Sequence, residues 1–178
     1  MKKFLKKIVL FILKKLALRR LRKFKGKVVA ITGSIGKTST KEAIYSVLNS
    51  RFKVKATKKS MNSEFGLLLT ILDVESGYSS ACKWSWLLLR AFYNSLLKDH
   101  SEILLLELGV DKPGDMDFLT SVVKPDISIM TNIFPVHMEA GQFDDLQAIF
   151  DEKRKIGDNM KEDGVAVLNI YNPFLAMF

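Results

Sequence analysis

The chain has 178 residues, of which 48% are hydrophobic, and this is enough apolar material for one domain with a core of its own. Its single cysteine, Cys82, excludes an internal disulfide and a cysteine-ligated metal cluster, so a reducing compartment fits best. The net charge is +9, but residues 1–27 hold 12 of the 28 Lys and Arg and no acid, whereas the remainder carries 16 basic and 19 acidic residues. Since a nucleic-acid enzyme is expected to spread positive charge over its body, we expect no nucleic-acid partner.

The first 26 residues predict a basic amphipathic helix. One apolar stripe at helical spacing, with lysines and arginines between its members, consists of Phe4, Ile8, Ile12 and Leu16. The longest uncharged run in this segment has six residues, far fewer than the ~20 that a membrane span needs. We expect residues 1–25 to make a peripheral contact with an anionic membrane surface. The alternative, a helix that packs on the domain, stays open.

The stretch from Val28 to Thr40 predicts a strand, a tight loop and a helix. Gly33 and Gly36 allow the backbone to approach a ligand, so that successive N–H groups and the positive end of the helix face an anion. Lys37 then supplies charge for the outer phosphates, and the Thr38 hydroxyl is placed to ligate Mg²⁺. The loop therefore predicts binding and use of ATP; the alternative is a glycine-rich turn with a surface lysine.

After this loop, apolar periodicity predicts alternating helices and strands. The expected helices cover 37–50, 67–72, 84–97 and 144–160, with a short one ending near 123, and the expected strands cover 52–56, 102–109, 127–131 and 165–168. Residues 173–178 carry no charge and predict no obvious terminating element. The predicted fold class is α/β, a P-loop-type, mostly parallel sheet flanked by helices and preceded by the basic N-terminal helix.

Three side chains stand out because of their places in these elements. Glu107 ends a continuous apolar strand, where a carboxylate is costly unless it is paired or bound to a cation, so we expect a second Mg²⁺ ligand. His137 lies in the loop after the next strand, and Lys153 falls on or beside the apolar face of its helix. The polar loop 57–66 follows a strand end, where open α/β sheets place ligand contacts, although such a loop alone is more often a surface turn.

Together these segments resemble the Mur ligases, the ATP-dependent amide-forming enzymes of peptidoglycan synthesis. The loop from Thr32 to Glu42 resembles their ATP loop. Asn62-Ser63-Glu64-Phe65-Gly66 is similar to the Asn-Asn-Glu-x-Gly segment of the branch that adds D-alanyl-D-alanine to the UDP-N-acetylmuramoyl tripeptide. Three further segments match that branch in order: Glu107-Leu108-Gly109 with Pro113-Gly114-Asp115, Thr131 to His137, and Val165 to Asn169.

The resemblance implies a role for each matching residue. The implied ATP-binding residues are Gly33, Ser34, Ile35, Gly36, Lys37, Thr38, Ser39 and Asn169, with Asn169 at the adenine. The implied metal ligands are Thr38 and Glu107 for one Mg²⁺, with His137 helping to hold a second. Lys153 falls where the family has a lysine carbamylated by CO₂, which would add an anionic oxygen ligand. Lys37, His137 and Lys153 would be catalytic, and Asn62 and Glu64 would meet the substrate.

The implied reaction has two steps. A carboxylate of a UDP-N-acetylmuramoyl-peptide attacks the γ-phosphate of ATP to give an acyl phosphate, and the amine of D-alanyl-D-alanine or an amino acid then displaces phosphate. We expect a cytoplasmic enzyme whose residues 1–25 contact the inner face of the cell membrane. One alternative is a folylpolyglutamate-synthase-like ligase, against which segments 62–66 and 107–115 argue. Another is a membrane-tethered P-loop module that binds nucleotide without making amides.

The sequence also departs from the family. Only the basic helix precedes the loop, where the family has a domain that grips the UDP-sugar. Leu68 stands where proline is expected, and Tyr171 and Asn172 replace two expected acids. We therefore expect residues 27–178 to be a central ATP-binding domain that is incomplete at its C-terminus, with residues 1–26 as a separate helix before it.

Overall fold

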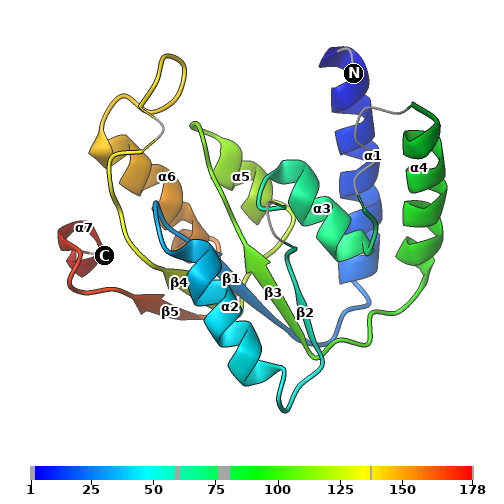
Figure 1. Cartoon of the computed structure of the whole chain (residues 1–178), viewed down its shortest axis with the longest axis horizontal. Helices are drawn as coiled ribbons and strands as arrows, with labels where there is room; N and C mark the ends of the chain where they lie inside the picture. The colour runs from blue at the N-terminus through cyan, green and yellow to red at the C-terminus, as the bar shows by residue number, and fades with distance from the viewer. Residues whose placement is uncertain (1–2, 59–60, 76–80, 137, 178) are drawn as a thin grey trace.

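The computed structural model describes residues 3–58, 61–75, 81–136 and 138–177. Its centre is a sheet of five strands in the order β2-β3-β1-β4-β5 (Figure 1). The strands are β1 (Lys27–Thr32), β2 (Val54–Ala56), β3 (Ile103–Glu107), β4 (Ile127–Met130) and β5 (Val165–Leu168). Every neighbouring pair is parallel, so the predicted fold class is confirmed. The first strand is the central one.

The helices of the described residues lie close to their predicted positions. They are α1 (Lys3–Leu21), α2 (Lys37–Leu48), α3 (Glu64–Leu72), α4 (Ala81–Leu96), α5 (Asp115–Thr120), α6 (Leu146–Asp158) and α7 (Pro173–Ala176). Helix α3 begins at Glu64, earlier than predicted, with an acid in its first turn where the helix dipole favours one. Helix α7 was not predicted; Pro173 occupies its first position, where a proline costs no hydrogen bond.

The two faces of the sheet are covered unequally. On one face, Val28 and Ala30 of β1 belong to the large core, which also takes in buried residues of α1, α3, α4, α5 and α6. On the other face, Val29 and Ile31 belong to a small core, against which Ile44 of α2 packs. The alternation along β1 is that of a strand buried on both sides. This places the loop after β1 between the two layers.

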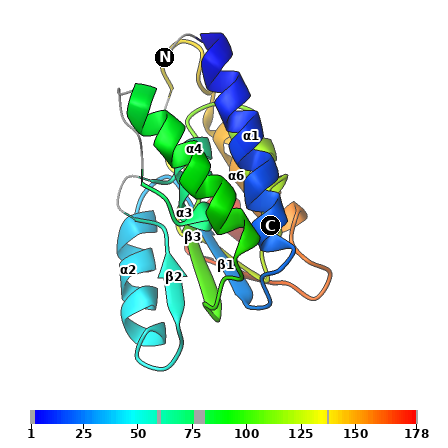
Figure 2. The same cartoon turned by 90° about the vertical axis from the view of Figure 1, so that its right-hand side faces the viewer.

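Helix α1 is docked on the large core. Val9, Leu13 and Ala17 are buried there, and the helix contacts α3 and α4, which Figures 1 and 2 show beside it. Phe4 and Ile8, from the stripe predicted as a membrane-facing side, are exposed. The packing that the sequence left open is therefore found on the inner face of α1; Leu16 of the predicted stripe also packs against this core, whereas Phe4, Ile8 and Ile12 are exposed. Among the described helices, none is both long and apolar enough to cross a bilayer.

Candidate functional site

The glycine loop lies at the carboxyl end of the central strand. Gly33 has φ 143° and Gly36 has φ 85°, backbone conformations that residues other than glycine rarely adopt. A Cβ atom on Gly33 would also overlap the hydroxyl of Thr131, which follows β4. Gly36 caps α2, whose first N–H groups have no acceptor within the helix and form its positive end. The loop thus has the shape of an anion cradle.

The segment after β4 holds this loop in place. The Thr131 hydroxyl donates to the Ile35 carbonyl at 2.6 Å, and the Ser34 N–H donates to the Asn132 carbonyl at 2.7 Å. The Ser34 hydroxyl donates to the Phe134 carbonyl at 2.9 Å and accepts from the Phe134 N–H at 3.0 Å. The Ser34 side chain is thus bonded to the segment after β4, and these four bonds fix the conformation of the loop.

Lys37 lies across the loop. Its Nζ donates to the carbonyls of Gly33 at 2.8 Å and Ser34 at 3.1 Å. Burial lowers the pKa of Lys37, while the charges of Glu107 and Asp111 partly offset this effect. The Lys37 ammonium is therefore held at the cradle. An anion bound there would stabilise its charged form and offset the unfavourable effect of burial.

Glu107 and Thr38 meet at the ends of β3 and of the loop. The Thr38 hydroxyl lies 3.1 and 3.0 Å from the two carboxylate oxygens, and the Asn62 amide donates to Oε1 at 3.1 Å. Glu107 is only 5% exposed. Hydroxyl and carboxylate oxygens are the hard ligands that Mg²⁺ prefers, so this pair fits such an ion. Within the described residues there is no group of three or more His, Cys, Asp or Glu that could hold a metal.

Lys41 is a residue of this site that the sequence analysis missed. Its side chain is 1% exposed, and its Nζ donates to the Thr57 carbonyl at 2.8 Å. The same nitrogen lies 3.5 Å from Glu107 Oε2 and 3.2 Å from the exposed Glu42. Its position four residues after Lys37, on the same side of the helix, is the signal that could have found it. Lys41 therefore holds the Glu107 carboxylate in position through its Oε2 atom.

Lys153 reaches the same region from α6. It is 1% exposed, and burial lowers its pKa to about 7, with the Lys37 cation acting in the same direction and Asp111 and Glu152 against it. The Lys37 charge therefore adds to the effect of burial on the pKa of Lys153. The other expected ligand at this place, His137, lies outside the described residues.

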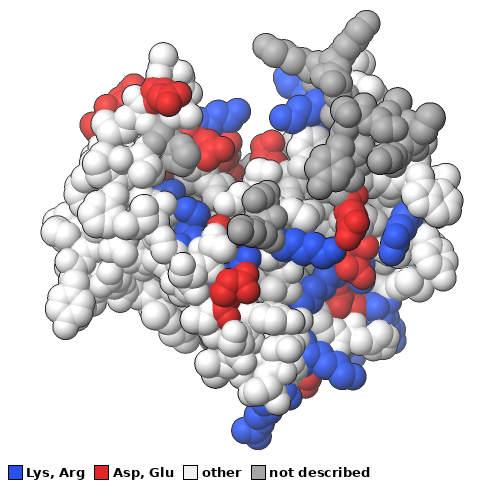
Figure 3. All heavy atoms as spheres, viewed as in Figure 1, with Lys and Arg blue, Asp and Glu red and all other residues white. Residues whose placement is uncertain are grey.

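The remaining predicted residues surround the loop. The Asn169 amide donates to Asn132 Oδ1 at 3.0 Å, which joins the end of β5 to the segment that holds the loop. Glu64 lines a pocket of about 220 Å³ together with Gly109, Asp111 and Lys6 of α1. Ile35 is half exposed at the loop tip, and Ser39 lies exposed in the first turn of α2. Figure 3 shows a hollow at the top of the molecule with acidic and basic side chains on its walls.

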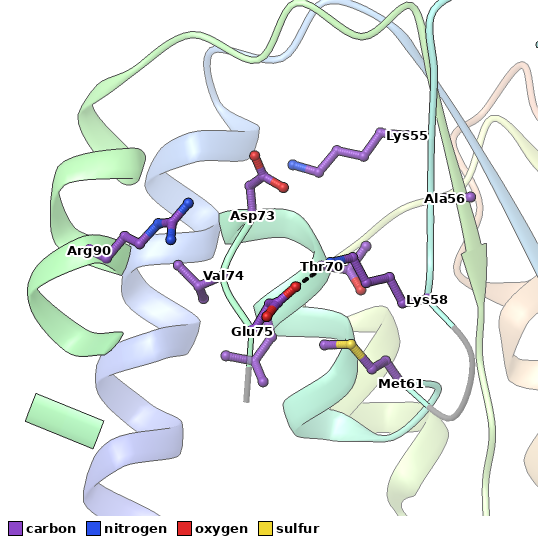
Figure 4. Close-up of a pocket in the computed structure, with 10 residues that line it drawn as sticks. Lys55, Ala56, Lys58, Met61, Thr70, Asp73, Val74, Glu75 and Arg90 are labelled. Carbon is purple, nitrogen blue, oxygen red and sulfur yellow. Dashed lines mark hydrogen bonds and ion pairs between the residues drawn. The ribbon is translucent and has the colours of Figure 1, made fainter. Parts of the chain in front are cut away.

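A larger pocket of about 380 Å³ lies elsewhere, between β2, α3 and α4 (Figure 4). Two of its lysines have carboxylate partners: Lys58 pairs with Glu75 at 2.8 Å, and Lys55 pairs with Asp99 at 2.9 Å. The ammonium groups of both lysines are thus already paired with carboxylates. The strand ends, where glycines, a helix N-terminus and buried charges converge, remain the better site despite their smaller pocket.

Comparison with known proteins agrees with this geometry. Residues 31–178 match the family described as the Mur ligase middle domain. The chain belongs to the Mur ligase family. The UDP-N-acetylmuramoyl-tripeptide--D-alanyl-D-alanine ligase of Borreliella burgdorferi is 38% identical over 174 residues, which are 97% of this chain and 30% of that protein. The Bacillus subtilis enzyme of the same name is 30% identical over 155 residues, 87% of this chain and 28% of the relative.

Solved structures give the same family. The MurF ligase of Thermotoga maritima in complex with ADP superposes with a TM-score of 0.75 at 32% identity, covering 94% of this chain and 34% of that one. Escherichia coli FolC in complex with ADP shares the fold alone, with a TM-score of 0.54 at 17% identity. This Mur ligase chain thus spans about a third of the length of the MurF proteins that it matches.

Proposed function

We propose that this chain is part of an ATP-dependent ligase of peptidoglycan precursor synthesis, of the MurF type. The observation that carries the proposal is the glycine loop with Lys37 bonded across it and the Glu107 carboxylate, 69 residues further along the chain, against the Thr38 hydroxyl. The names of the relatives support the substrates: a UDP-N-acetylmuramoyl tripeptide and D-alanyl-D-alanine. In this proposal residues 27–178 are an incomplete central domain, and the reaction takes place in the cytoplasm.

The loop and α2 would bind ATP. The N–H groups at the start of α2 and the Lys37 ammonium would meet its phosphates, and Asn169 would lie on the adenine side. Thr38 and Glu107 would hold Mg²⁺, which supplies neutralisation of phosphate charge. The Asn62 amide, bonded to Glu107 Oε1 at 3.1 Å, would orient that carboxylate, and Glu64 would face the peptide substrate.

Lys153 would be carbamylated. A pKa of about 7 leaves much of this amine neutral near neutral pH, and the neutral amine is the form that attacks CO₂. A nitrogen–carbon bond forms, the amine loses a proton, and the product is a carbamate anion. The modification would replace an amine that repels Lys37 when it is protonated by an anion that attracts Lys37. His137 would help to hold a second metal ion.

A carbamate can be sought directly in the 178-residue chain. With ¹³C-labelled bicarbonate we expect a carbamate carbon resonance that is lost in Lys153→Ala and kept in Lys124→Ala, a substitution of an exposed lysine. In a chain extended to the length of its relatives, Lys153→Ala should abolish ligation and leave nucleotide affinity within about threefold. Removing CO₂ from the wild type should lower ligation, and bicarbonate should restore it. A fully active Lys153→Ala variant would refute this role and favour a nucleotide-binding module without ligase activity.

We also propose a peripheral contact of residues 1–25 with an anionic membrane. It is supported by the absence of acids from residues 1–27, which carry 12 Lys and Arg. Each basic residue near an anionic surface contributes about 1 kcal/mol. Deleting the segment would be a poor test, because Val9, Leu13 and Ala17 belong to the core. Neutralising exposed cations is the test that leaves the fold intact.

A further inference from the structure

Two neighbouring helices expose large apolar side chains on their outer faces. In α1, Phe4 is 76% exposed and Phe11 58%; in α4, Trp86 is 68%, Leu89 65% and Tyr93 61% exposed. The two helices pack against each other and lie side by side toward the viewer in Figure 2. These five residues define what we name the α1/α4 surface.

This surface is not needed to hold the helices in place. Each helix has a separate inner face, with Leu13 of α1 and Leu87 and Ala91 of α4 buried in the large core. The outer residues of α4 recur at helical spacing, so they form one stripe. An exposed apolar patch of this kind marks an interaction site, and Trp and Tyr favour the boundary between lipid and water.

The charged side chains that α1 and α4 themselves carry are all basic. Neither α1 nor α4 contains Asp or Glu. The exposed cations Lys15, Arg19 and Arg22 make no ion pair within the described parts of the chain, and Lys15 lies 4.5 Å from the centre of the Phe11 ring. By contrast, Lys27, Lys155 and Lys161 each pair with a carboxylate. Free cations beside exposed aromatics complement anionic headgroups over an apolar layer.

We propose that α1 and α4 together form one docking face for an anionic lipid bilayer. Trp86, Leu89 and Tyr93 enter the interface, while the cations of α1 meet the lipid phosphates. This inference rests on the proposed membrane contact of residues 1–25 and adds α4, which lies outside that segment. Because both inner faces are fixed to the core, the docking face is rigid and preformed.

Vesicle co-sedimentation of the 178-residue chain tests the proposal. Vesicles of phosphatidylglycerol with phosphatidylcholine are compared with phosphatidylcholine alone. Lys15→Gln/Arg19→Gln should weaken binding to the anionic vesicles roughly 30-fold, since each basic residue contributes about 1 kcal/mol. The variant Trp86→Ser/Leu89→Ser/Tyr93→Ser should weaken it at least about tenfold through lost apolar burial. The control Val47→Ser/Tyr171→Ser, which removes equally exposed residues elsewhere, should bind like the wild type.

The outcomes separate the inference from its premise. If the α4 variant binds like the wild type and the α1 variant does not, the contact of residues 1–25 stands and the role of α4 is refuted. If neither variant differs from the wild type, both fail. If the α4 variant instead abolishes a dimer seen by light scattering and vesicle binding is unaffected, the occupant is a second copy of the chain. Nucleotide affinity, unchanged in every variant, shows that the site and the fold are intact.

Trp86 also reports on its own surroundings. Its fluorescence emission should shift to shorter wavelength on anionic vesicles, because the indole ring leaves water. Trp84, which packs edge-to-face on Phe65, should not respond. Trp86→Phe should keep the binding and lose the shift. A shift that persists in Trp86→Phe would contradict insertion of this residue.

Discussion

The lysines at the strand ends and the lysines on the outer face of α1 have opposite surroundings. Lys41 and Lys153 are 1% exposed, and each faces other charged groups. Lys15 and Arg19 are exposed and make no ion pair within the described residues. Burial turns a lysine into a positioning or reactive group, whereas exposure leaves it free for a partner. The net charge of +9 therefore reflects two unrelated uses of the same residue type.

The largest expected effect on stability comes from replacing one of the two buried lysines, Lys41. Lys41→Met removes the cation 3.5 Å from Glu107 Oε2 and leaves a buried carboxylate with one partner fewer. We expect a loss of roughly 3–5 kcal/mol in the free energy of unfolding, measured by urea denaturation. Magnesium dependence of nucleotide binding should also weaken, because Glu107 loses the group that orients it.

Glu42→Gln is the matched control for Lys41→Met. It removes the exposed partner of the same lysine, 3.2 Å away, and surface pairs contribute about 0–1 kcal/mol. Equal stability of Lys41→Met and the wild type would show that the Lys41 pair does not support the site.

The next effect separates the two faces of α1. Leu13 is fully buried and Ile12 is 38% exposed. Leu13→Ala should lower the unfolding free energy by about 3 kcal/mol, since it removes buried methyl groups and leaves a cavity. Ile12→Ala should cost less than about 1 kcal/mol. Similar losses at the two positions would contradict the docking of α1 described above.

Lys153 predicts a pH dependence of stability. Its folded-state pKa of about 7 lies below the ~10.4 of an unfolded chain. Between these values the unfolded state binds more protons, so stability should rise with pH, by at most about 1.4 kcal/mol per unit. Lys153→Met should lack this rise. Urea denaturation in CO₂-free buffer at about pH 7 and pH 9 measures it; parallel curves for both proteins would refute it.

The smallest effect is expected on the exposed side. Lys15→Gln/Arg19→Gln should change the unfolding free energy by less than about 0.5 kcal/mol, because surface substitutions away from caps and pairs rarely do more. A loss above 1 kcal/mol would mean that these cations stabilise the fold and are not free for lipid. Thermal unfolding of the variant and the wild type at two salt concentrations measures this difference in stability.

Much of the fold could be predicted because its signals are local. Continuous apolar runs identified β1 and β3, and the glycine loop fixed the start of α2. Glu107 was found because a carboxylate at the end of such a run needs a partner, and Lys153 because it fell beside an apolar stripe. The structure gives Glu107 the contacts of Thr38 and Lys41, and it buries Lys153, whose pKa the Lys37 charge helps to lower.

The features that could not be predicted depend on contacts distant in sequence. The inner face of α1 was not identified, because apolar residues surround this helix and periodicity does not choose among its faces. Lys41 resembles a solvated helix lysine until Thr57 and Glu107 are placed around it. Asn62 was assigned to substrate by resemblance alone, whereas its bond to Glu107 joins residues 45 positions apart.

Strand β5 has a practical consequence for all of these experiments. Within the described residues it pairs with β4 alone, and Val165 and Val167 are 57% and 48% exposed. A bare strand edge flanked by valines is a template on which other chains can add. Concentrated samples of this chain should therefore form oligomers slowly, and Val167→Lys should delay turbidity without altering the affinity for nucleotide.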